Sequence, residues 1–172
     1  EFVRESKWQI AQSVMLWVDQ GASMRFASGA NLPEKADRAR VLGLALSILL
    51  LRGGERVGLT GTALPPRRGN PQLLRLAEMF CQDDDTDYSP PEHRAMIPNA
   101  RAVYISDFMG DLTPVQNALT KAADRGVRGV LFHVLDPSEE AFPFTGRTIF
   151  ESVGGTLTHE TLKANDLKSR YL

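Results

Sequence analysis

The chain has 172 residues, enough for one domain that buries a core between a sheet and its covering helices. Its 20 basic and 21 acidic residues give a formal net charge of -1, which argues against nucleic acid or an anionic membrane as the binding partner. The only cysteine, Cys81, excludes an internal disulfide, and the opening residues lack the pattern of a secretory leader, so we expect a cytoplasmic protein.

The extent of the chain and its longest apolar run set two further expectations. The first residue is Glu1 rather than Met, and we expect residues 1–172 to be a single domain that lacks an N-terminal stretch of a longer protein. The apolar run Val41 to Leu51 is about half the length that a bilayer span requires. It therefore predicts a core helix, and no membrane span in this chain.

The first predicted strand is the apolar run Val14 to Val18, whose β-branched and aromatic members are typical of a central strand. This strand ends at Asp19. A helix is predicted from Pro33 to Leu51, and because it is apolar almost all round after Val41, we expect it to lie deep in the core. Residues 55–61 predict a second strand, and the proline-bearing "TALPPRRGNP" that follows predicts a loop or an edge hairpin.

The middle of the chain alternates between a helix, a loop and a strand. Residues 71–80 have the apolar spacing of an amphipathic helix. The acidic, proline-bearing stretch 82–99 predicts a long exposed loop, and we interpret the run Asp83 to Asp87 within it as solvated and mobile. Ala102 to Ser106 then predicts a strand that ends at Asp107.

A further helix and strand follow. Thr113 and the proline after it predict the cap and first turn of a helix that continues to Gly126. "GVLFHVLD" predicts a third apolar strand that ends at Asp136, and we interpret His133 within it as a hydrogen-bonded core residue. None of the three histidines has a Cys or His partner at zinc-ligand spacing.

The end of the chain predicts two short strands about Gly154 and a terminal helix over Lys163 to Leu172. Strands separated by helices predict a mostly parallel sheet with helices on both faces. Ligand sites in such sheets lie beyond the carboxyl ends of the strands. Asp19, Asp107 and Asp136 all fall at that edge, which makes it the candidate site.

Asp19, Gly21 and Ser23 have the spacing of the D-x-S-x-S cation motif of von Willebrand factor A-type domains, with Gly21 in place of the first serine. Asp107 holds the strand-end position that such domains also use, and hard ions such as Mg²⁺ prefer oxygen ligands. Two interpretations remain open. Either Asp19, Ser23 and Asp107 bind Mg²⁺ or Mn²⁺ weakly, or Asp19 and Ser23 hold the loop by bonding backbone amides.

A second chemistry uses Asp19 as the nucleophile of a metal-dependent phosphoryl-transfer enzyme. Enzymes of the haloacid dehalogenase type place such an aspartate after a buried strand, with a second carboxylate two residues later as the general acid. Gly21 stands at that position here. We therefore expect no catalytic residue and no required cofactor, and we retain phosphoryl transfer as the alternative.

Several stretches together resemble one family, the domain-of-unknown-function family 58. They are "FVRE" at residues 2–5, "WVDQGASM" at 17–24, "KADRARVLGLALSILLLRGGERVGL" at 35–59, "YISDF" at 104–108 and "HVLDPSEEAFPF" at 133–144. The resemblance implies a von Willebrand A-like, Rossmann-like three-layer α/β sandwich, with a mostly parallel central sheet of about six strands and one antiparallel edge strand. It further implies a non-catalytic adaptor that works with a MoxR-type AAA+ ATPase or another von Willebrand A-type protein in the maturation or assembly of client complexes.

Domains of this type bind partners through the loops at the carboxyl edge of the sheet. Phe26, Phe108 and Met109 lie in these loops and are the candidate partner-binding residues. For Phe108 a second interpretation is equally open, in which its ring folds back onto the core.

Overall fold

The computed structural model describes residues 11–164 and 166. The resembling "FVRE" stretch and most of the helix predicted for residues 163–172 lie outside the described residues. Among the helices of the described part, none combines the length and the apolar character that a bilayer crossing demands.

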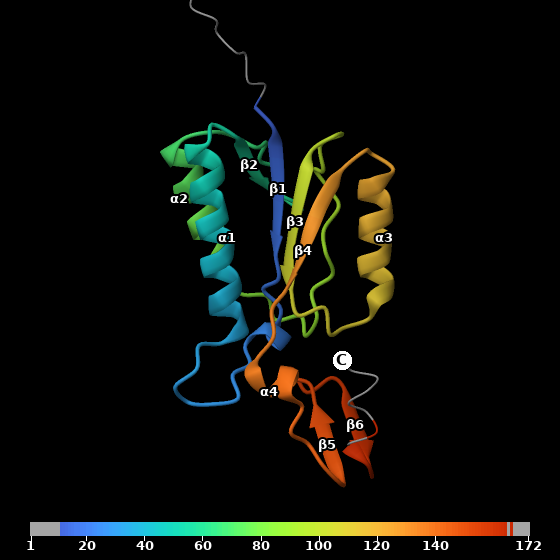
Figure 1. The fold of residues 1–172 in the computed structure, drawn as a ribbon. Coiled ribbons are helices and arrows are strands. Elements are labelled where there is room, and N and C mark those ends of the chain that lie inside the picture. Colours follow the sequence, from blue (N-terminus) through green and yellow to red (C-terminus); the bar gives the residue numbers. More distant parts are fainter. Residues whose placement is uncertain (1–10, 165, 167–172) are drawn as a thin grey trace, which may run out of the picture.

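A four-stranded parallel sheet forms the centre of the molecule (Figure 1). Its strand order is β2-β1-β3-β4, and the strands are β1 (Ser13–Val18), β2 (Arg56–Leu59), β3 (Arg101–Ser106) and β4 (Arg128–His133). In register, Leu16 of β1 lies opposite Leu59 of β2 and Val103 of β3. The predicted parallel α/β architecture is confirmed.

The expected single sheet of about six strands is not what the described residues form. The other two strands, β5 (Thr148–Glu151) and β6 (Thr158–Thr161), pair antiparallel in a separate hairpin. Beside β2, the expected antiparallel edge strand is reduced to one bridge between Val57 and Arg67. The prolines at positions 65 and 66 explain this, because they cannot donate to a longer ladder.

Helices cover both faces of the sheet. α1 (Lys35–Arg52) and α2 (Asn70–Phe80) lie on one face, and α3 (Leu112–Ala123) lies on the other (Figure 1). Side chains of β1 alternate between the two cores: Leu16 packs on the side of α1 and α2, and Trp17 on the side of α3.

The expectation that the helix after Pro33 lies deep is wrong. Val41 and Leu49 of α1 are 67% and 66% exposed. The buried stripe of α1 consists mostly of small residues, namely Ala36, Ala39, Gly43 and Ser47, with Lys35 at its start. A Cβ atom added at Gly43 would lie 3.0 Å from a methyl group of Val18, so small side chains let α1 approach β1 closely.

Three local predictions need correction. α1 begins at Lys35 rather than at Pro33. The cap of α3 is Asp111, whose carboxylate accepts the N–H of Thr113, because a carboxylate two residues ahead of Thr113 reaches the free amides of the first turn. His133 is exposed at the end of β4 rather than buried, because β4 is an edge strand of the described sheet.

The short helix α4 (Pro137–Ala141) and the β5–β6 hairpin lie beyond the carboxyl ends of the parallel strands (Figure 1). Residues 84–87 of the acidic stretch pair with residues 20–23 on this side, and Asp87 is buried rather than solvated. The Asp87 carboxylate accepts the N–H of Gly154 at 3.0 Å and the hydroxyl of Thr156. The interpretation of residues 83–87 as a solvated, mobile run is therefore wrong for Asp87, which anchors the turn of the hairpin.

Candidate functional site

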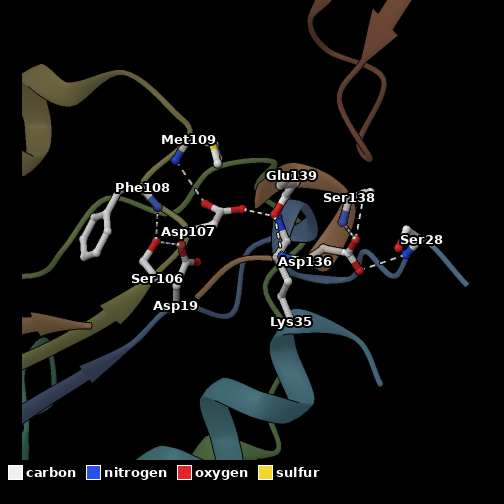
Figure 2. A network of polar contacts seen from close by, with 10 residues as sticks. All are labelled: Asp19, Ser28, Lys35, Ser106, Asp107, Phe108, Met109, Asp136, Ser138 and Glu139. Atoms are coloured by element: carbon white, nitrogen blue, oxygen red, sulfur yellow. Dashed lines mark hydrogen bonds and ion pairs between the residues drawn. The ribbon is translucent and has the colours of Figure 1, made fainter. Parts of the chain in front are cut away.

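Three aspartates meet at the carboxyl edge of the sheet, as the sequence predicts. Asp19 follows β1, Asp107 follows β3, and Asp136 lies three residues after β4 at the start of α4 (Figure 2). Their exposed fractions are 4%, 1% and 3%, so all three carboxyl groups lie in the interior. A buried carboxylate needs hydrogen-bond donors or a cation nearby to compensate for the loss of water.

Asp19 is held by two hydrogen bonds. Its Oδ1 accepts the N–H of Gly21 at 2.9 Å, and its Oδ2 accepts the hydroxyl of Ser106 at 2.6 Å. The Ser106 oxygen in turn accepts the N–H of Phe108 at 2.9 Å. Burial raises the pKa of Asp19 to about 6, against the lowering effect of the bonds from Ser106 and Gly21 and with a further rise from the nearby charge of Asp107.

Lys35 supplies the positive charge of the site. Its Nζ lies 2.8 Å from Oδ2 of Asp107 and 2.7 Å from Oε1 of Glu139, and its side chain is 4% exposed. The Phe26 ring centroid lies 5.5 Å from the same nitrogen, a cation–π distance. Burial alone lowers the pKa of Lys35, but the charges and hydrogen bonds of Asp107 and Glu139 outweigh it and raise that pKa. Lys35 is therefore a buried ammonium ion.

Asp136 and Glu139 form a capping box at the start of α4. Asp136 accepts the N–H and the hydroxyl of Ser138, while Glu139 accepts the N–H of Asp136 at 2.9 Å. The second oxygen of Asp136 accepts the N–H of Ser28 at 3.0 Å. Burial alone raises the pKa of Asp136, but the bonds from Ser28 and Ser138 outweigh it and hold that pKa well below its usual value. The loop after β1 is thus tied to α4.

The predicted cation ligands are brought together only in part. Asp19 and Asp107 share the edge, and the Ser23 hydroxyl is buried with no hydrogen-bond partner among the described residues, as a free ligand would be. Both oxygens of Asp19 are nevertheless engaged, and Asp107 accepts Lys35 on one oxygen and the N–H of Met109 on the other. No group of three or more His, Cys, Asp or Glu residues in the described part could hold a metal ion. The carboxylate oxygens of Asp19 and Asp107 are thus engaged by donors of the chain itself.

Two charged residues of this edge, Lys35 and Glu139, were not predicted from the sequence. Lys35 carried a usable signal, because it stands at the start of the helical stripe of small residues that faces the sheet. Glu139 carried another, since an aspartate followed three residues later by a glutamate, with a proline between them, is a capping-box pattern.

The three predicted partner-binding residues lie at this edge and are each partly buried. The ring of Phe108 packs against the core on the α3 face and lies 6.2 Å from the His133 ring. This is the folded-back position that the sequence left open. Phe26 faces Lys35, and the N–H of Met109 donates to Asp107 at 3.1 Å.

The fold and this edge define the class: an α/β domain with a parallel sheet whose carboxyl edge is closed by buried ion pairs. The model of the family described as "Protein of unknown function DUF58" matches residues 1–171, and the chain belongs to this family. Searches of curated proteins and of solved structures found no significant match.

Proposed function

We propose that this chain is a non-catalytic protein-binding module that docks through the carboxyl edge of its sheet, with a MoxR-type AAA+ ATPase or another von Willebrand A-type protein as partner. The observation that carries the proposal is the closed state of the edge. Asp19, Asp107 and Glu139 are all engaged by donors of this chain. A site so occupied favours a structural platform over a reaction centre.

The burial and hydrogen bonding of Asp19 disfavour a role as the nucleophile of phosphoryl transfer. A nucleophilic carboxylate needs an open line of approach to the phosphorus atom, whereas Asp19 is 4% exposed and has donors on both oxygens. Burial is sufficient to explain its raised pKa, so that pKa requires no catalytic role. Two hollows of about 140 and 190 Å³ open on the surface, and neither is lined by Asp19 or Asp107.

Exposed apolar side chains on the same side of the molecule support docking there. Leu112, three residues beyond Met109, is 53% exposed. On the β5–β6 hairpin, Ile149 and Leu157 are 61% and 58% exposed. The hairpin extends beyond the carboxyl edge of the sheet (Figure 1). Apolar surface of this kind is typical of protein interaction sites.

The test is capture of a purified MoxR-type ATPase from the same source by Met109→Asp and by Leu112→Asp. We expect both variants to keep the wild-type melting temperature within a few degrees and to bind at least about tenfold more weakly, the usual result of placing a charge in an apolar contact. Leu49→Asp is the control, because Leu49 is 66% exposed, more than Leu112, but lies near the far end of α1.

Two results would contradict the proposal. One is wild-type capture by both folded edge variants. The other is turnover of a generic aryl phosphate that disappears in Asp19→Asn, because that result would establish the enzymatic alternative.

A further inference from the structure

The ammonium group of Lys35 lies where three elements meet. Asp107 belongs to the end of β3, Glu139 to α4, and Lys35 to the first turn of α1 (Figure 2). Its Nζ is within 2.8 Å of both carboxylates, and its side chain is 4% exposed. The positive charge of Lys35 therefore links α1 to the end of β3 and to α4, the helix that precedes the β5–β6 hairpin.

We propose that the Lys35 ammonium is the permanent cation of this edge and replaces the divalent ion of a D-x-S-x-S site. An ammonium ion offers three hydrogen-bond donors and one charge on a tether. A divalent ion such as Mg²⁺ instead requires about six oxygen ligands in an octahedron. The Lys35 ammonium has two carboxylate partners at 2.8 and 2.7 Å, and the described residues contain no group of three or more His, Cys, Asp or Glu that could hold a metal ion.

Gly21, which stands in place of the motif's first serine, agrees with this assignment. Gly21 has φ -62° and ψ 161°, which any residue adopts, so backbone conformation does not demand glycine. The atoms packed around position 21 are what favour glycine there. A Cβ atom at position 21 would lie 3.0 Å from the Ser89 nitrogen and 3.1 Å from both Asp19 Oδ1 and the Asp87 carbonyl oxygen. The acidic loop and Asp19 would therefore have to shift by a few tenths of an ångström to admit the serine that a metal site uses.

A consequence for binding follows. A partner that recognises a bound metal ion places its own carboxylate on that ion, but the Lys35 ammonium is enclosed by Asp107, Glu139 and Phe26. Docking at this edge is therefore independent of divalent ions and insensitive to chelators. This consequence rests on the proposed function, whereas the assignment of the ammonium as resident cation does not.

The first experiment compares melting temperatures of the wild type and Lys35→Met with and without millimolar Mg²⁺, Mn²⁺ or Ca²⁺. The wild type is expected to show no shift. Lys35→Met leaves the buried Asp107 and the partly buried Glu139 without a counter-charge. We expect its melting temperature to fall by about 10 °C and to recover in part with a divalent ion. Lys35→Met/Asp107→Asn is expected to lose the recovery.

Lys121→Met is the matched control, because Lys121 is exposed on α3 and pairs only with His93 among the described residues. We expect it to show neither the loss nor the metal response. A Lys35→Met protein that is as stable as the wild type, or one that is destabilised but unaffected by divalent ions, would overturn the assignment.

A second experiment covers the case in which Lys35→Met does not fold. Mn²⁺ binding to the wild type is followed by electron paramagnetic resonance, with Asp107→Asn as reference, and lysine side-chain NMR counts ammonium groups protected from exchange. One protected ammonium and no Asp107-dependent Mn²⁺ binding support the assignment. Stoichiometric Mn²⁺ binding that is lost in Asp107→Asn overturns it. Failure to capture the ATPase, with or without chelator, contradicts only the proposed function.

Discussion

The buried carboxyl group of Asp19 makes the stability of the protein depend on pH in a defined direction. Its pKa rises from 3.8 to about 6 on folding, chiefly because of burial. A shift of about two units corresponds to roughly 3 kcal/mol. The folded form holds this proton more tightly than the unfolded chain does, so the contribution of Asp19 to the free energy of unfolding falls as pH rises from about 4 to about 6 and then stays low.

Asp19→Asn removes this titration and nearly keeps the shape of the side chain. The amide oxygen can accept the Gly21 N–H, and the amide nitrogen can donate to Ser106. Relative to the wild type, we expect the free energy of unfolding of the variant to gain roughly 3 kcal/mol between pH 4 and pH 7. The free energy of unfolding of the variant at pH 4 depends on how well the amide replaces the two hydrogen bonds of Asp19.

The assay is urea unfolding of both proteins at half-unit steps from pH 4 to pH 8. Other carboxylates with lowered pKa values, such as Asp84 and Asp136, act in both proteins and cancel in the difference. Asp37→Asn, at an exposed carboxylate of α1, controls for the loss of one negative charge. A difference that stays flat over this range, or that changes with the opposite sign, would refute the reasoning.

Two further predictions concern the acidic loop. Gly21→Ser is expected to lower the free energy of unfolding by about 1–3 kcal/mol, since its Cβ would lie 3.0–3.1 Å from three atoms. Gly29→Ser is the control and should change that free energy little, because a Cβ at position 29 has its nearest neighbour at 3.6 Å. Equal urea midpoints for the two variants would contradict the packing argument. Asp87→Ala is expected to speed amide exchange and proteolysis in residues 148–161, because it removes the acceptor of Gly154 and Thr156. The exposed Asp85→Ala is its control.

The sheet was predictable from the sequence because its inner strands are covered on both faces. Val14 to Val18 and Ala102 to Ile105 are continuous apolar runs, and both lie in buried strands of the structure. The apolar run of β4 also forms a strand of this sheet, as predicted, but Val130 and Leu131 are 51% and 50% exposed. β4 is an edge strand of the described sheet, and the sequence alone does not reveal whether another strand lies beside it.

The depth of α1 and the role of Lys35 were missed through one assumption, that large apolar residues mark the buried face. In α1 the fully buried residues are small, whereas several leucines beside them are partly buried against the core and Val41 and Leu49 are exposed. A lysine in phase with Ala36, Ala39 and Gly43 therefore points inward. Its partner Glu139 lies 104 residues away in sequence, and no local pattern identifies a pair so separated.

The departures from a metal-binding motif at this edge are coupled rather than independent. The acidic loop packs so closely against Gly21 that a serine there would require its atoms to shift, and its Asp87 anchors the hairpin. Without that serine a divalent ion has one oxygen ligand fewer, and the charge of Asp107 needs another counter-ion. Lys35 supplies it, and because its charge is shared with Glu139, the same ammonium also fixes α4, from which the chain continues to the hairpin. The packing of the acidic loop, the ion pairs of Lys35 and the position of the hairpin are therefore linked through shared residues. We expect a substitution in any one of them to destabilise the other two as well.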